Sequence, residues 1–205
     1  MPPAPPSSSP SPFYDPAHEL ALIVEAYHKS GDVGILLDQL KALAKRTAPE
    51  TLKTWARGYH EMPEVVIPLY ERIVAAQPND AQAIVVLANA YWLTGRGPEV
   101  VNKLANQAKS LDPTNRGAWH LWALAESDLR KRVDRWHDVT KKFPSDQLAR
   151  AALADNATSL ANDETDPVAL KLAIATYEGL LAESTAVAQQ LAIEQSLKVL
   201  RGWKL

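Results

Sequence analysis

The feature that most constrains the fold is a pattern of small and bulky apolar residues at helical spacing. It is clearest in residues 83–95, AIVVLANAYWLTG, where apolar side chains fall at positions i, i+3, i+4 and i+7: Ile84, Leu87, Ala88 and Tyr91. This is one face of an amphipathic helix, since a strand would alternate with period two. A small residue on that face allows a neighbouring helix to approach closely, so the pattern predicts helices packed in pairs.

Prolines recur along the chain at the ends of the segments expected to be helical. They stand at Pro49, Pro78, Pro113 and Pro144, which are 29, 35 and 31 residues apart. Similar helical segments at a nearly fixed period indicate a repeat architecture in which each unit buries its apolar surface against the next. The apolar pattern and the prolines together predict an all-α array of helix pairs.

Composition supports a folded chain and excludes several function classes. Hydrophobic residues make up 46% of the sequence and charged residues 22%, close to the globular average. The net charge of -2 gives no electrostatic reason to expect nucleic acid or an anionic membrane as a partner. Because the chain contains no Cys, disulfides, thiolate metal sites and cysteine nucleophiles are excluded.

No apolar run approaches the roughly 18 residues that a membrane helix requires. The first residues also lack the basic start and apolar centre of a signal peptide. We therefore expect a soluble protein without membrane insertion, located in the cytoplasm.

Residues 1–15 differ in composition from the rest, with many prolines and serines and one charged side chain. Such a segment cannot bury enough apolar surface to offset its ordering entropy, which predicts a disordered tail. Its Pro-x-x-Pro spacing suits an SH3 or WW groove, and Ser9 and Ser11 precede prolines as in phosphorylation sites. The alternative is an ordinary disordered terminus.

The unit that leads to Pro113 resembles the tetratricopeptide repeat. Its order is a bulky residue, Leu, a small residue, Tyr, Gly, Ala and Pro, carried by Ile84, Leu87, Ala88, Tyr91, Gly95, Ala105 and Pro113. The other units depart in places: Pro68 is expected to kink or delay its helix, and Glu126 stands where Tyr is expected. The resemblance implies a right-handed α-solenoid, with four to five hairpins over residues 16–183 and a C-terminal capping helix over 184–205.

In tetratricopeptide arrays the first helix of each pair lines a concave groove that binds a peptide or helix of another protein. Carried onto this sequence by register, the groove would contain Glu25, His28, Lys29, Lys53, Arg57, His60, Asn89, Trp92, Leu93, His120, Leu121, Leu124 and Arg150. The chaperone-binding subfamily clamps a carboxylate with Lys and Asn, but Ala21 and Glu25 stand at its first two positions. That clamp is therefore not expected.

Three features of this set each allow two interpretations. His28, His60 and Trp92 share one offset, so they form either a ladder of flat side chains or an accidental column. Lys53 and Arg57 either bind one acidic group together or form a solvated basic face. Trp92 follows the core residue Tyr91 and either marks a recognition surface or packs under the adjoining repeat. Trp119, Trp122 and Trp136 fall at core offsets and are expected to be structural.

The sequence carries no motif of catalysis or cofactor binding. It has no phosphate-binding glycine loop and no HExxH, and none of the five histidines has a second histidine at i+3 or i+4: His18, His28, His60, His120 and His137. We expect no enzyme activity, no cofactor and no metal.

The sequence therefore predicts an adaptor or assembly factor that binds a partner protein in the concave groove. The first alternative is a structural subunit that uses its outer faces to form a homo-oligomer or a larger complex. The second is a regulatory domain for an enzyme encoded elsewhere.

Overall fold

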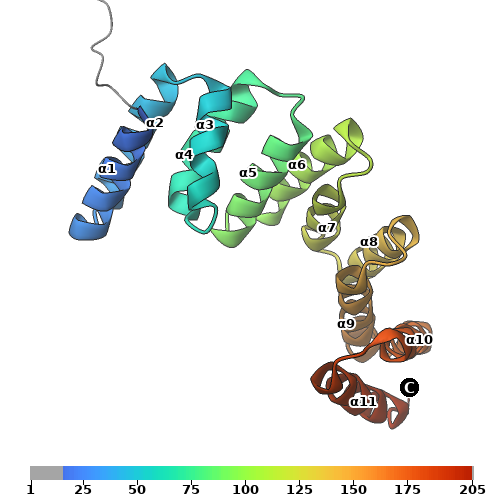
Figure 1. The fold of residues 1–205 in the computed structure, drawn as a ribbon. Coiled ribbons are helices and arrows are strands. Elements are labelled where there is room, and N and C mark those ends of the chain that lie inside the picture. Colours follow the sequence, from blue (N-terminus) through green and yellow to red (C-terminus); the bar gives the residue numbers. More distant parts are fainter. Residues whose placement is uncertain (1–15, 205) are drawn as a thin grey trace, which may run out of the picture. The chain divides into compact units, whose positions relative to one another are not determined.

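A computed structural model describes residues 16–204 of the chain (Figure 1). Every regular element in this range is a helix, so the predicted all-α class is confirmed. The proline- and serine-rich segment, residues 1–15, lies outside the described residues. The helices divide between two compact units, residues 1–77 and 78–205.

The first unit contains two helix pairs. The first helices are α1 and α3 and the second helices are α2 and α4, with a short 3-10 helix, η1, after α3: α1 Pro16–Ser30, α2 Val33–Arg46, α3 Pro49–Ala56, η1 Arg57–Tyr59 and α4 Pro63–Ala76. Each first helix packs on its own second helix, and α2 also packs on α4. Val24 on α1 and Ala56 on α3 are buried in this packing.

The second unit contains three helix pairs and one further helix. Its elements are α5 Ala81–Leu93, α6 Pro98–Leu111, α7 Arg116–Leu124, α8 Leu129–Lys142, α9 Gln147–Glu164, α10 Pro167–Glu183 and α11 Val187–Arg201. Each helix packs on the next one along the chain, and α5 also contacts α7. Ala88, Val101, Ala105 and Leu121 are buried together where α5, α6 and α7 meet, which explains the small residues of the opening pattern.

The ends of the helices follow from local sequence. Pro78, Pro113 and Pro144 stand two residues after α4, α6 and α8 end, as the spacing predicts. Pro49 differs, because it begins α3, where its fixed φ and missing N–H are tolerated. Gly95 follows α5 with φ +68°, and the Arg96 N–H donates to the Tyr91 carbonyl, a closing turn that favours glycine.

Pro68 does not delay its helix. The helix α4 begins at Pro63 and continues through Pro68 to Ala76. The proline ring is buried with Val65, Ile67 and Leu69, and this burial offsets the lost backbone hydrogen bond.

Candidate functional site

Side-chain caps set the register of the first helices in the second unit. Asp80, Asn115 and Asp146 each stand two residues after a proline and accept the N–H of the third residue beyond them. Counting from these caps aligns α5, α7 and α9 residue by residue. This register identifies which predicted groove residues lie on equivalent faces of these helices.

The outer end of α5 presents an apolar surface. Asn89 is exposed, Trp92 is 37% exposed and Leu93 is 62% exposed. The preceding residue, Tyr91, packs against the core, and the Cζ atom of Arg96 lies 5.3 Å from the centroid of its ring. Trp92 and Leu93 therefore point away from the packed face of α5 and are accessible to a ligand.

Two predicted groove residues on α7 pack against other parts of the fold. Leu121 is 5% exposed and packs with Ala88 and Val101, so its assignment to an open groove is wrong. Close approach of α5 and α7 buries it: a Cβ added at Gly117 would lie 3.0 Å from Val85. Leu124 is half-buried against the neighbouring core.

His120 connects α7 to the start of α9. Its Nε2 lies 2.6 Å from Oδ2 of Asp146, and its ring meets the edge of Trp136 with centroids 5.3 Å apart. Burial raises the pKa of Asp146, but hydrogen bonds from Ala149 and His120 and the charges of His120 and Arg116 outweigh it. The pKa of Asp146 is therefore held below its ordinary value. His120 is therefore held by structural contacts with Asp146 and Trp136.

The predicted residues on α1 are exposed and paired with each other. Lys29 Nζ lies 2.6 Å from Oε1 of Glu25, one helical turn away. The hydrogen bond and the charge of Lys29 lower the pKa of Glu25. His28 is exposed beside them. This short run presents both signs of charge to solvent.

The predicted residues around α3 do not share one helical face. Lys53 lies on α3, where its Nζ is 3.0 Å from Oε1 of Glu50. The helix α3 ends at Ala56, so Arg57 belongs to η1 and not to α3. His60 follows η1, and its Nδ1 lies 3.1 Å from the Arg57 carbonyl. The common offset of His28, His60 and Trp92 therefore does not describe equivalent helical positions, because the backbone leaves the α-helix before His60.

Arg150 differs most from its predicted position. It stands four residues after the Asp146 cap, where α5 has the fully buried Ile84 and α7 has Trp119. Its side chain is 16% exposed and forms an ion pair with Glu183 at the end of α10. It therefore occupies a packing position between helices, and its assignment to the groove face is wrong.

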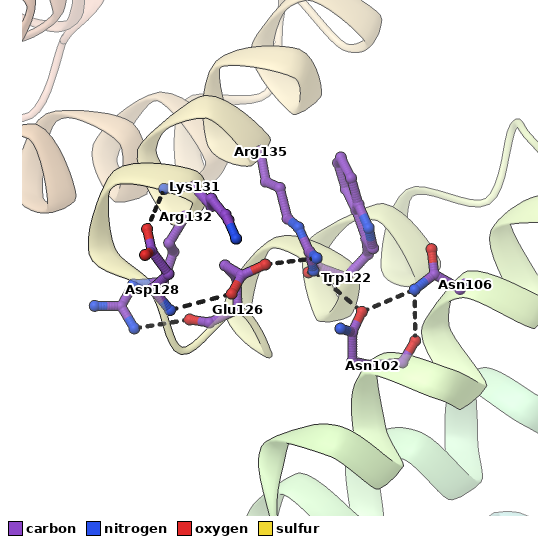
Figure 2. A network of polar contacts seen from close by, with 8 residues as sticks. All are labelled: Asn102, Asn106, Trp122, Glu126, Asp128, Lys131, Arg132 and Arg135. Atoms are coloured by element: carbon purple, nitrogen blue, oxygen red, sulfur yellow. Dashed lines mark hydrogen bonds and ion pairs between the residues drawn. The ribbon is translucent and has the colours of Figure 1, made fainter.

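A polar network around Glu126 was not predicted from the sequence (Figure 2). Arg135 Nη2 lies 2.6 Å from Oε2 of Glu126, and Nη1 donates to Oδ1 of Asn102 and to the Trp122 carbonyl. The side chains of Arg135 and Glu126 are only 18% and 12% exposed. The one sequence signal was Glu126 itself, an acid where the repeat pattern has Tyr.

Aromatic and basic side chains extend this network. Lys109 Nζ lies 3.3 Å from the ring centroid of Trp122 and 4.6 Å from that of Trp119. Burial lowers the pKa of Lys109, and the charge of Arg135 lowers it further. Trp119 and Trp122 meet edge to face with centroids 5.5 Å apart. These contacts link α6, α7 and α8.

Two further features concern only residues 16–204. No group of three His, Asp or Glu side chains comes together there in a way that would hold a metal ion. Every helix in this range is too short or too polar to cross a bilayer.

No protein-family model matches the sequence, and no curated protein matches it. Solved structures do resemble the fold. TTC0263, a thermophilic TPR protein of Thermus thermophilus, has a TM-score of 0.56 and 19% identity over 90% of this chain and 100% of its own. The MamA protein has a TM-score of 0.57 and 15% identity over 84% of this chain and 97% of its own. At these identities the similarity shows a tetratricopeptide-like fold of antiparallel helix pairs, which confirms the predicted fold class.

Proposed function

We propose that this tetratricopeptide-like chain is an adaptor or assembly factor that binds a segment of another protein on the first-helix face of its second unit. The observation that carries the proposal is the adjacent exposure of Trp92 and Leu93 at the end of α5. An accessible Trp beside an aliphatic residue is typical of the anchors that dominate protein interfaces.

The residues around these anchors define the chemistry of the partner segment. Val85 is half-buried on the same helix and Asn89 is exposed, and neither carries charge. The end of α5 thus offers apolar and amide groups beside the exposed Arg96, a surface suited to an amphipathic helix or an extended apolar peptide. The charged residues of the first unit are not required by this proposal.

Replacing both anchors should abolish partner binding without unfolding the chain. We expect the Trp92→Ala, Leu93→Ala variant to recover at least about tenfold less partner than the unchanged chain from an extract of its own cells, because loss of a hot spot costs about 2 kcal/mol or more. Quantitative mass spectrometry of the captured proteins measures this. Val168→Ala is the matched control, since Val168 is 73% exposed on α10. Equal recovery by the anchor variant and the control would contradict the proposal.

A second candidate function, a subunit of a homo-oligomer, is favoured by the outer face of α11. Val187, Leu191 and Val199 on this helix are 69%, 61% and 51% exposed. If α11 pairs with a second copy, light scattering after size exclusion should give a dimer mass. Leu191→Glu should then reduce the mass to that of one chain, because a charge is costly in an apolar interface. A single-chain mass before substitution would exclude this candidate.

A further inference from the structure

An arginine occupies a position where the equivalent helices carry apolar residues. Counted from the caps, Arg150 of α9 corresponds to Ile84 of α5 and Trp119 of α7. Burying a guanidinium removes it from water, whereas an apolar side chain at the same place would stabilise packing directly. This position therefore carries an ion pair to α10 where the equivalent helices carry apolar side chains.

The hydrogen bonds of this guanidinium are incomplete. Nη1 donates to Oε1 of Glu183 at 2.7 Å, and Nη2 pairs with the other oxygen of the same carboxylate. Nε is buried and has no acceptor. A donor that is shielded from water and unpaired is costly, so the pairing of Arg150 with Glu183 alone leaves its hydrogen bonds incomplete.

A cleft of about 310 Å³ opens beside Arg150 between three helices. Leu153 from α9 and Leu172 from α10 give it aliphatic walls, and the other lining residues include Thr140, Thr176, Gly179 and the exposed His137. A Cβ added at Gly179 would meet no atom within 4 Å. Glycine is disfavoured inside a helix, and at this position a larger side chain would have room to extend into the cleft.

The carboxylate that now pairs with Arg150 stands at the surface, at the end of α10. Glu183 is 52% exposed and is the last residue of α10, where the helix dipole disfavours negative charge. Arg150 lowers the pKa of Glu183, so this side chain is ionised at neutral pH. A carboxylate of a ligand would therefore compete with Glu183 for the fork of Arg150.

We propose that the cleft between α8, α9 and α10 binds a carboxylate on a short aliphatic stem, with Arg150 as the binding residue and Glu183 as an internal competitor. Its source is a glutamate side chain of a partner protein, because the cleft accepts an aliphatic stem beside the fork that matches a carboxylate. This site is distinct from the Trp92 surface and goes beyond the proposed function.

Titration of the full-length chain tests the site directly. The probe is N-acetyl-glutamate N-methylamide, followed by the NMR signal of the Arg150 Nε–H group. The glutamine analogue is the uncharged control. We expect the glutamate probe alone to shift this signal, and Glu183→Gln to tighten its Kd by about tenfold, since the variant removes a competing carboxylate. An equal Kd with and without Glu183→Gln, or equal shifts by both probes, would overturn the proposal.

Two variants separate binding from folding. Arg150→Met restores an apolar residue at this position and should abolish probe binding without lowering the Tm. Gly179→Met should fill the cleft and block the probe while the pair of Arg150 and Glu183 remains. Binding of the probe that survives in both variants would place it elsewhere and reject this cleft.

A last binding experiment tests whether the carboxylate comes from a partner protein or from a small acid. Free butyrate carries the same single carboxylate on the same aliphatic stem without a peptide backbone, so tighter binding of butyrate than of the capped amino acid would indicate a small acid and refute the partner side chain. The Trp92→Ala, Leu93→Ala variant should bind the probe normally, which separates this site from the proposed function.

Discussion

Replacing Glu126 with alanine should lower the free energy of unfolding by about 3 kcal/mol, because it removes one partner of a largely buried ion pair. Oε2 of Glu126 lies 2.6 Å from Nη2 of Arg135, and its Oε1 accepts the Asp128 N–H at 3.1 Å. Without this carboxylate, the guanidinium stays among Asn102 and Trp122 with its charge uncompensated. Urea unfolding followed by circular dichroism measures the loss.

The loss of unfolding free energy in Glu126→Ala should come from the unpaired charge of Arg135 and not from the missing side chain of Glu126. The double variant Glu126→Tyr, Arg135→Leu places the tyrosine of the repeat pattern at this position and removes the arginine. We expect it to recover stability to within about 1 kcal/mol of the unchanged chain, since apolar replacement of a buried pair is often neutral.

The exposed Glu194 on α11 provides a matched control for the loss of a carboxylate. Glu194→Ala should change the free energy of unfolding by less than about 0.5 kcal/mol. If Glu126→Ala costs no more than this control, the pair of Glu126 and Arg135 does not stabilise the fold.

The helix pairs could be predicted from the sequence because their signals are local. Ala88 and Tyr91 set a helical period, and Gly95 and Pro113 mark where helices end. Those signals act over one or two helical turns. The network of Glu126, Arg135 and Asn102 joins three helices, so no local pattern could identify its contacts.

The candidate site was harder to predict because its residues depend on register. The prediction placed Arg150 on the groove face and so put α9 out of register, whereas Arg150 aligns with the buried Ile84. The Asp146 cap, two residues after Pro144, would have corrected this, since Asp80 and Asn115 follow their prolines at the same interval. Placing Arg57 and His60 correctly required knowledge of where α3 ends, which helix propensity alone does not give.

Asp146 should be the most important helix cap of the second unit. Its side chain is 3% exposed, and its oxygens accept the Ala149 N–H at 3.2 Å and meet His120 Nε2 at 2.6 Å. Asp146→Ala removes both contacts and should lower the free energy of unfolding by about 2 to 4 kcal/mol. Asp146→Asn keeps a capping oxygen but loses the charge, so we expect about half that loss at pH 7.

The pH dependence of these variants separates the charge from the cap. The folded-state pKa of Asp146 lies below its ordinary value, so the ionised carboxylate stabilises the fold above the unfolded-state pKa of about 4. That contribution is lost as the pH falls through the folded-state pKa. The difference in unfolding free energy between the unchanged chain and Asp146→Asn should therefore shrink as the pH falls below about 4.

Denaturant unfolding at pH 7, 5 and 3 measures this difference. Asp32→Asn is the matched control, because Asp32 caps α2 through the Ile35 N–H but is exposed. A difference for Asp146→Asn that stays unchanged down to pH 3 would show that its charge does not stabilise the fold. The contact with His120 would then serve only to orient the imidazole between α7 and α9.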